Sequence, residues 1–143
     1  MIRIICVGRL KGMLREAEQE YIKRIGFYAK AELIEIPEYK SSNSLECLKK
    51  EGERIKGQLK GFVIVLDANG SQLPSERFAE LLRNHEITFV IGSHLGLSED
   101  IKKMANASVS FSKMTFPHQL LRIMLLEQVY RGFTILKGQP YHK

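Results

Sequence analysis

Three short segments combine residue types that could bind a ligand: residues 66–70 (LDANG), 92–96 (GSHLG) and 111–119 (FSKMTFPHQ). In GSHLG, the glycines allow the backbone to approach a ligand closely. In LDANG, Asp67 offers a carboxylate to an amine or a hydroxyl. Both segments also have an ordinary structural explanation, because a tight turn after a strand uses the same residues. Taken alone, each of these two segments favours a turn.

The third segment is more informative because of the helix that follows it. Pro117 is typical of the start of a helix, Thr115 is a suitable cap, and His118 on the first turn is usually solvated. The apolar surface of the helix predicted over residues 117–131 is wider than the usual stripe of about 100°. Its apolar positions are Leu120, Leu121, Ile123, Met124, Leu125, Leu126, Val129 and Tyr130.

A helix that is apolar on nearly every side needs two packing surfaces. We expect one to be its own sheet and the other a second subunit, since symmetric homodimers are the commonest oligomers. Leu125 and Val129 are the candidate partner-facing positions. Glu127 and Arg131 are four residues apart and are expected to pair at the edge of the helix.

The chain ends in Tyr141, His142 and Lys143. Terminal residues are usually frayed. The alternative is a stacking and proton-handling pair that becomes ordered on a substrate, and the residue types alone do not separate the two.

Several chemistries lack their sequence signals. The loop at residues 92–96 is not a dinucleotide fingerprint, and no Gly-Lys-Ser/Thr of a P-loop occurs. Cys6 and Cys47 stand apart without a Cys/His cluster, so zinc is not expected. There is no dense carboxylate set for magnesium and no spacing that favours a covalent nucleophile. We expect no metal.

The elements that must position these segments alternate along the chain. Apolar β-branched runs predict strands near residues 2–7, 33–36, 62–66, 87–91 and 108–112. Helices are predicted between them, with Ser44 and Ser98 as caps and an Asn69-Gly70 turn after the third strand. This order predicts one α/β domain over residues 1–143, with a mainly parallel sheet covered by helices on both faces. Ligands bind at the carboxyl ends of such strands, which selects the same three loops.

Composition limits the partners. The 143 residues suit one core, and the net charge of +6 raises the odds of a polyanionic partner. No apolar run approaches the ~18 residues of a membrane span, and the first residues do not form a signal peptide. We therefore expect a reduced, cytoplasmic protein without membrane contact.

Several blocks of the chain match a known family. They are residues 4–11 (IICVGRLK), 32–40 (ELIEIPEYK), 65–70 (VLDANG), 89–96 (FVIGSHLG), 110–133 (SFSKMTFPHQLLRIMLLEQVYRGF) and 140–143 (PYHK). On these motifs the chain resembles the RlmH family of SPOUT-class methyltransferases, which act on a pseudouridine of 23S ribosomal RNA. The likeness covers essentially the whole chain.

The resemblance implies a SPOUT-like fold with a C-terminal trefoil knot, a homodimer, and S-adenosylmethionine held in the knotted loops. It implies methylation at N3 of the pseudouridine within the assembled ribosome, with the dimer partner completing the site. Carried over by motif, the cofactor contacts are Leu66, Gly92, Phe111, Ser112, Lys113, Met114, Thr115 and Phe116. The catalytic candidates are Tyr141, His142 and Arg131. Arg9, Lys11, Arg15, Lys23 and Arg24 would meet the RNA.

One residue departs from the family pattern. The family commonly has two adjacent glycines where this chain has Gly92 and Ser93. If the second position required a positive φ, Ser93 would strain the loop; if only Gly92 approaches the cofactor, Ser93 is harmless. Two alternatives therefore stay open: a ribosome-binding factor with a non-catalytic cofactor pocket, and an unrelated nucleotide-binding enzyme, which the missing phosphate motifs disfavour.

Overall fold

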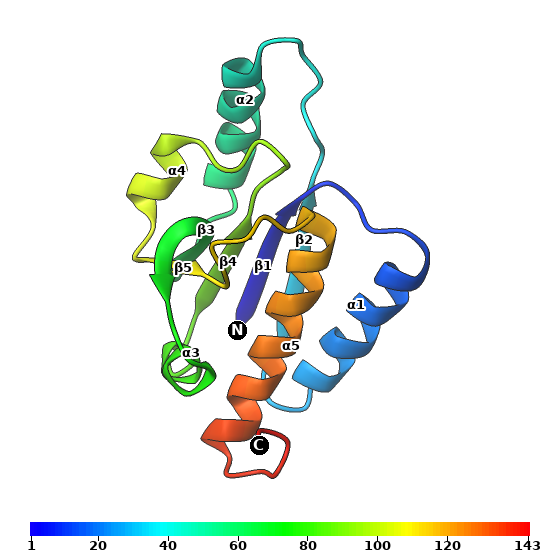
Figure 1. Ribbon diagram of the computed structural model, residues 1–143, viewed down its shortest axis with the longest axis vertical. Helices are drawn as coiled ribbons and strands as arrows, with labels where there is room; N and C mark the ends of the chain where they lie inside the picture. The colour runs from blue at the N-terminus through cyan, green and yellow to red at the C-terminus, as the bar shows by residue number, and fades with distance from the viewer.

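The computed structural model describes residues 1–143. Its five strands form one sheet. All four strand pairings are parallel. The spatial order is β2-β1-β4-β3-β5 (Figure 1). The strands are β1 (Ile2–Val7), β2 (Ala31–Ile36), β3 (Phe62–Gln72), β4 (Ile87–Ile91) and β5 (Ala107–Ser110). The predicted parallel sheet is confirmed.

Helices cover both faces of this sheet. On one face lie α1 (Gly12–Ile25), α3 (Ser75–Leu81) and α5 (His118–Leu136), with α5 between the other two (Figure 1). On the other face lie α2 (Ser44–Lys56) and α4 (Glu99–Met104). The prediction of a two-sided sheet is confirmed.

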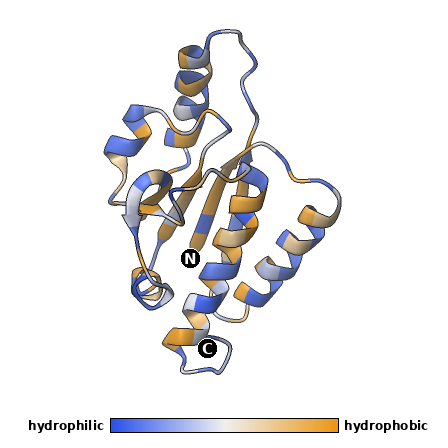
Figure 2. Cartoon of the chain, in the orientation of Figure 1, coloured by the Kyte–Doolittle hydropathy of each residue, from blue (hydrophilic) through white to orange (hydrophobic).

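The strands alternate their side chains between two hydrophobic cores. On β1, Ile4 and Cys6 belong to the core under α5, whereas Ile5 and Val7 belong to the core under α2 and α4. Burial on both faces explains why most strand residues are apolar, as the mainly orange colouring of the central strands in Figure 2 shows. None of the helices is long and apolar enough to cross a membrane.

The turn predicted at Asn69-Gly70 is wrong. β3 continues to Gln72, and after a register shift beyond Leu66 its end pairs again with β5. A Cβ on Gly70 would lie 2.7 Å from the carbonyl carbon of Ser108, so the two strands approach closely there. Pairing with β5 therefore outweighs the local turn preference of Asn-Gly.

Two of the three predicted caps are also wrong. Asn43, not Ser44, caps α2, and its side chain accepts a hydrogen bond from the Glu46 amide. Pro117 occupies the N-cap position of α5, where Thr115 was expected. Ser98 caps α4 as predicted.

Leu125 and Val129 do not face a partner. Both are completely buried in the core of the chain itself, together with Leu126 on the same helix. α5 packs on the sheet and is flanked by α1 and α3. These contacts within the chain bury, fully or in part, most of the apolar side chains around the helix. Of the eight apolar positions predicted for this helix, five stay partly open: Leu120, Leu121, Ile123, Met124 and Tyr130.

Candidate functional site

The three predicted loops meet at the carboxyl ends of β3, β4 and β5. They enclose a cavity of about 490 Å³, lined among others by Leu66, Gly92, Thr115 and Phe116. A smaller adjoining cavity of about 150 Å³ is lined by Leu66, Thr115 and Phe116 again, together with Phe111, Ser112 and Met114. Lys113 lines neither and faces an open hollow beside Asn69 and Gly70.

The loop after β4 is shaped by its two glycines. A Cβ on Gly92 would lie 2.2 Å from the carbonyl oxygen of Gly96, so no other residue fits there without movement of the loop. Gly96 has a φ of +85°, which favours glycine. Ser93 and Gly96 form an antiparallel bridge, and the Gly96 amide donates to the Ser93 carbonyl over 2.9 Å. The loop is therefore a tight reversal with its backbone at the cavity wall.

Ser93 fits this loop without strain. No residue other than glycine has a positive φ, so the position does not require the second glycine of the family pattern. The hydroxyl of Ser93 donates to the Glu51 carboxylate over 3.1 Å and accepts from the Leu95 amide over 3.2 Å. Ser93 thus replaces a glycine with a side chain that has its own hydrogen-bond partners.

The sequence reasoning missed Glu51. Only 3% of it is exposed, and its second oxygen accepts from the Tyr39 amide over 3.1 Å. A signal was present, because Glu51 falls between Cys47 and Ile55 at spacings of four, on the buried stripe of α2. A charged residue on such a stripe is nearly always paired.

The loop after β5 is held by two serines. Ser110 donates from its hydroxyl to the Ser112 carbonyl over 2.9 Å, and the Met114 amide donates to the Ser112 hydroxyl over 3.0 Å. Phe111 packs edge-on against Phe78 of α3. These contacts fix the turn that carries Thr115 and the half-buried Phe116 into the cavity wall.

The cavity has few charged groups. Asp67, at the point where β3 bends, pairs with Lys102 of α4 over 3.4 Å, and both line the wall. His94 and His118 also line it, and apolar contacts come from Leu97 and Leu121. No group of three or more His, Cys, Asp or Glu side chains could hold a metal ion.

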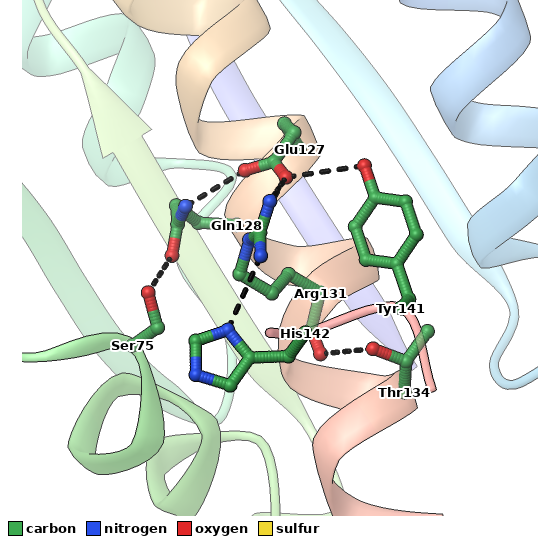
Figure 3. Close-up of polar contacts among 7 residues, drawn as sticks. All are labelled: Ser75, Glu127, Gln128, Arg131, Thr134, Tyr141 and His142. Atoms are coloured by element: carbon green, nitrogen blue, oxygen red, sulfur yellow. Dashed lines mark hydrogen bonds and ion pairs between the residues drawn. The ribbon is translucent and has the colours of Figure 1, made fainter. Parts of the chain in front are cut away.

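The three catalytic candidates lie together (Figure 3). Arg131 donates to Glu127 over 2.6 Å, which confirms the expected pair, and also contacts Nδ1 of His142 over 3.1 Å. The Tyr141 hydroxyl donates to the same carboxylate over 3.2 Å. Tyr141 also stacks edge-on against Tyr130, so the tail folds back on α5.

These contacts define the proton positions. Arg131 can only donate, so Nδ1 of His142 accepts, and the proton on Nε2 is directed at Glu76 over 2.8 Å. The hydrogen bond with His142 lowers the pKa of Glu76. Burial, reinforced by the charge of Glu127, raises the pKa of Tyr141 to about 12. Tyr141 is therefore a neutral hydrogen-bond donor near neutral pH.

A single chain does not bring the tail to the cavity. His118 begins α5 beside the cavity, whereas Arg131 lies 13 positions further along the same helix. At 1.5 Å per residue these positions are roughly 20 Å apart. The two halves of the predicted site thus lie toward opposite ends of α5 (Figure 1).

Comparisons with known proteins agree with this fold. A sequence model of the family described as "Predicted SPOUT methyltransferase" matches residues 1–142. A probable methylase family protein of Haemophilus influenzae has a similar fold, with a TM-score of 0.64, 13% identity, and coverage of 99% of this chain and 70% of that one. The family match, together with the fold, shows that the chain is a SPOUT methyltransferase.

Three relatives are each named ribosomal RNA large subunit methyltransferase H. The protein of Caldicellulosiruptor saccharolyticus is 52% identical, and 100% of each chain is covered. Those of Clostridium beijerinckii and Enterococcus faecalis are 47% and 43% identical, with 99% of each chain covered. The chain belongs to the RlmH family.

Proposed function

We propose that the protein transfers a methyl group from S-adenosylmethionine to N3 of a pseudouridine in 23S ribosomal RNA, within the assembled ribosome. The observation that carries the proposal is the single cavity formed by all three strand-end loops. The names of the relatives support ribosomal RNA as the substrate. A substrate in the ribosome leads us to expect the protein in the cytoplasm.

The lining of the cavity suits this cofactor. Leu66, Leu97, Leu121 and Phe116 offer apolar walls to an adenine ring. Among the residues that line the cavity, Lys102 is the one lysine, and there is no arginine. Because Lys102 is paired with Asp67, neither residue type offers a free cation to a phosphate. S-adenosylmethionine has no phosphate; when bound, it supplies an electrophilic methyl group on a cationic sulfur. The Asp67 carboxylate and the Gly92 backbone are suited to its amine and hydroxyl groups.

The tail residues suit the acceptor. N3–H of a pseudouridine is a weak acid, and it must lose its proton for the nitrogen to attack. His142 is the base candidate, because the Nδ1 lone pair that accepts from Arg131 can accept the N3 proton instead. Glu76 would then stabilise the imidazolium through Nε2. The Arg131 cation and the neutral Tyr141 hydroxyl are placed to stabilise the developing anion.

A homodimer is the arrangement that would join the two halves. With roughly 20 Å between cavity and tail on one chain, the tail of one subunit must serve the cavity of its partner. The open face between α3 and α5 supports such a contact: it contains a cavity of about 500 Å³ lined mainly by apolar side chains, among them Leu73, Ile123 and Met124. The partner would bring donor and acceptor into alignment, which is the main requirement of a direct displacement.

Methylation of ribosomes tests the proposal. Ribosomes that lack the modification are incubated with the protein and S-adenosylmethionine, and the 23S RNA is digested and examined by mass spectrometry. One added methyl on a pseudouridine-containing fragment is expected. An unchanged mass would contradict the reaction.

The binding-factor alternative has lost its main argument, because Ser93 is unstrained. Calorimetry with the cofactor separates the two functions, since a ligand that binds also stabilises the fold. Heat of binding and a raised melting temperature are expected for the enzyme; a protein that binds ribosomes but shows neither favours the alternative.

A further inference from the structure

A second and larger cavity lies beside the cofactor pocket. It is a groove of about 1040 Å³ at the carboxyl ends of β1 and β2. The loop from β1 to α1, the residues after β2 and the first turn of α5 form its walls, all at the same end of the sheet (Figure 1). This volume is at the upper limit of small-molecule pockets, which are roughly 300–1,000 Å³. The groove thus has room for more than one nucleotide.

Three cations of the groove have no partner. Arg9 and Lys11 come from the loop after β1, and Lys40 comes from the segment after β2. All three are exposed, and none takes part in any ion pair of the protein. By contrast, Arg15 is paired with Glu35 and Arg24 with Glu20. The groove therefore presents three positive charges that no carboxylate of the chain neutralises.

The two carboxylates of the groove offset only part of this charge. Glu35 is neutralised by Arg122 over 2.9 Å and by Arg15 over 3.8 Å. Glu38 lies 3.9 Å from Nε2 of His118, and this pair faces the same cavity. The groove consequently combines unpaired cations with two polar side chains, Glu38 and His118, and with the apolar side chains of Leu14 and Leu120.

The groove adjoins the cofactor pocket. Pro117 and His118 line both cavities, so only these two residues separate them. The groove also accounts for two segments that the cofactor pocket leaves without a role, residues 4–11 and 32–40: the ends of both segments line it.

We propose that this groove binds a single-stranded segment of the ribosomal RNA next to the target nucleotide. Arg9, Lys11 and Lys40 contact its phosphates, because unpaired cations gain most from displacing counterions. Glu38 and His118 contact base or ribose edges, as in single-stranded RNA recognition. The inference rests on the proposed function, since it assigns the RNA path to the site that would hold the methyl donor.

Charge-neutral variants test the groove. The test variant carries Arg9→Gln, Lys11→Gln and Lys40→Gln; the control carries Lys49→Gln, Lys56→Gln and Lys103→Gln, three exposed lysines outside both cavities. Both lose the same charge. Binding to ribosomes is measured over a range of potassium chloride concentrations at fixed magnesium, and binding of S-adenosylmethionine is measured by calorimetry.

We expect the test variant to bind ribosomes about tenfold or more weakly and to bind the cofactor normally. Its salt slope should fall by about 2, because each single-strand phosphate contact contributes about 0.7. The control variant should behave as wild type. Three results would contradict RNA binding by the groove. They are an equal loss of ribosome affinity in the two variants, a wild-type salt slope in the test variant, and no ribosome binding by the wild-type protein. Ribosome binding without methyl transfer by the wild-type protein would contradict the proposed reaction instead. The comparison of ribosome binding by the two variants would still test whether the groove binds RNA.

Discussion

The hydroxyl of Ser93 donates a hydrogen bond over 3.1 Å to the buried carboxylate of Glu51. The second oxygen of the same carboxylate accepts from the Tyr39 amide. One side chain of α2 therefore ties the loop of the cofactor pocket to the segment that carries Lys40 into the neighbouring groove.

Ser93→Ala should destabilise the protein. The buried Glu51 oxygen loses its donor, and an unsatisfied buried acceptor costs about 1–3 kcal/mol. The free energy of unfolding is measured in urea at one protein concentration, and the affinity for the cofactor, which should also fall, is measured by calorimetry. Ser42→Ala is the matched control, because Ser42 is exposed and has no side-chain hydrogen bond. Equal stabilities of the two variants would contradict the role of this contact.

Deletion of residues 141–143 should abolish methylation while the fold and the proposed dimer stay intact. The reason is that Tyr141 and His142 contact Glu127, Arg131 and Glu76, at the end of α5 away from the cofactor cavity. Methyl incorporation into ribosomes and circular dichroism are the measurements. Deletion of the exposed Lys143 alone is the control and should retain activity. Normal turnover by the longer deletion would mean that the tail has no catalytic role.

Tyr141→Phe should lower methylation by about tenfold or more, which is the usual size of a hydrogen bond to a charged group. The ratio of wild-type to variant activity should be the same from about pH 7 to pH 10, because a raised pKa of about 12 keeps the Tyr141 phenol protonated over that range. Ultraviolet absorbance of tyrosinate should show a late-titrating tyrosine that disappears in the variant. A factor that changes with pH would show that Tyr141 ionises earlier than its burial indicates.

Met124→Glu should convert the proposed dimer into monomers, because Met124 lines the open apolar face between α3 and α5. Sedimentation velocity measures the change. Met104→Glu is the control, since Met104 is 43% exposed on the opposite face of the sheet. Leu125→Glu should instead unfold the chain, because Leu125 is in the core. A dimer that survives Met124→Glu would place the subunit contact elsewhere.

Arg122→Leu should cost about 3–5 kcal/mol of unfolding free energy, the usual penalty for leaving one buried ion without its partner. Arg122 is 2% exposed and donates to Glu18, which is 3% exposed, and to Glu35. Burial already raises the pKa of Glu18. Urea unfolding measures the loss. The double variant Arg122→Leu with Glu18→Leu should recover much of it, because no buried charge then remains unpaired. Equal losses in the single and double variants would contradict this account.

Much of the fold could be predicted from the sequence because its signals are local. Mostly apolar, β-branched runs predicted the observed bounds of β1 and β4, and the alternation of strands with helices predicted the parallel sheet. The end of β3 was not predictable, since Asn69-Gly70 has the local preference of a turn and only pairing with β5 overrides it. The trefoil knot stays a prediction, because the hydrophobic pattern of a chain does not record how it threads.

The sequence by itself determined the sheet and the three loops at its carboxyl edge, because parallel strands end at one edge and their loops must meet. Only the tertiary structure decided that Leu125 and Val129 belong to the core, that Ser93 is held by Glu51, and that the tail lies roughly 20 Å from the cavity. Each of these depends on which residues distant in the chain become neighbours. That outcome is set by packing between elements, which no local pattern contains.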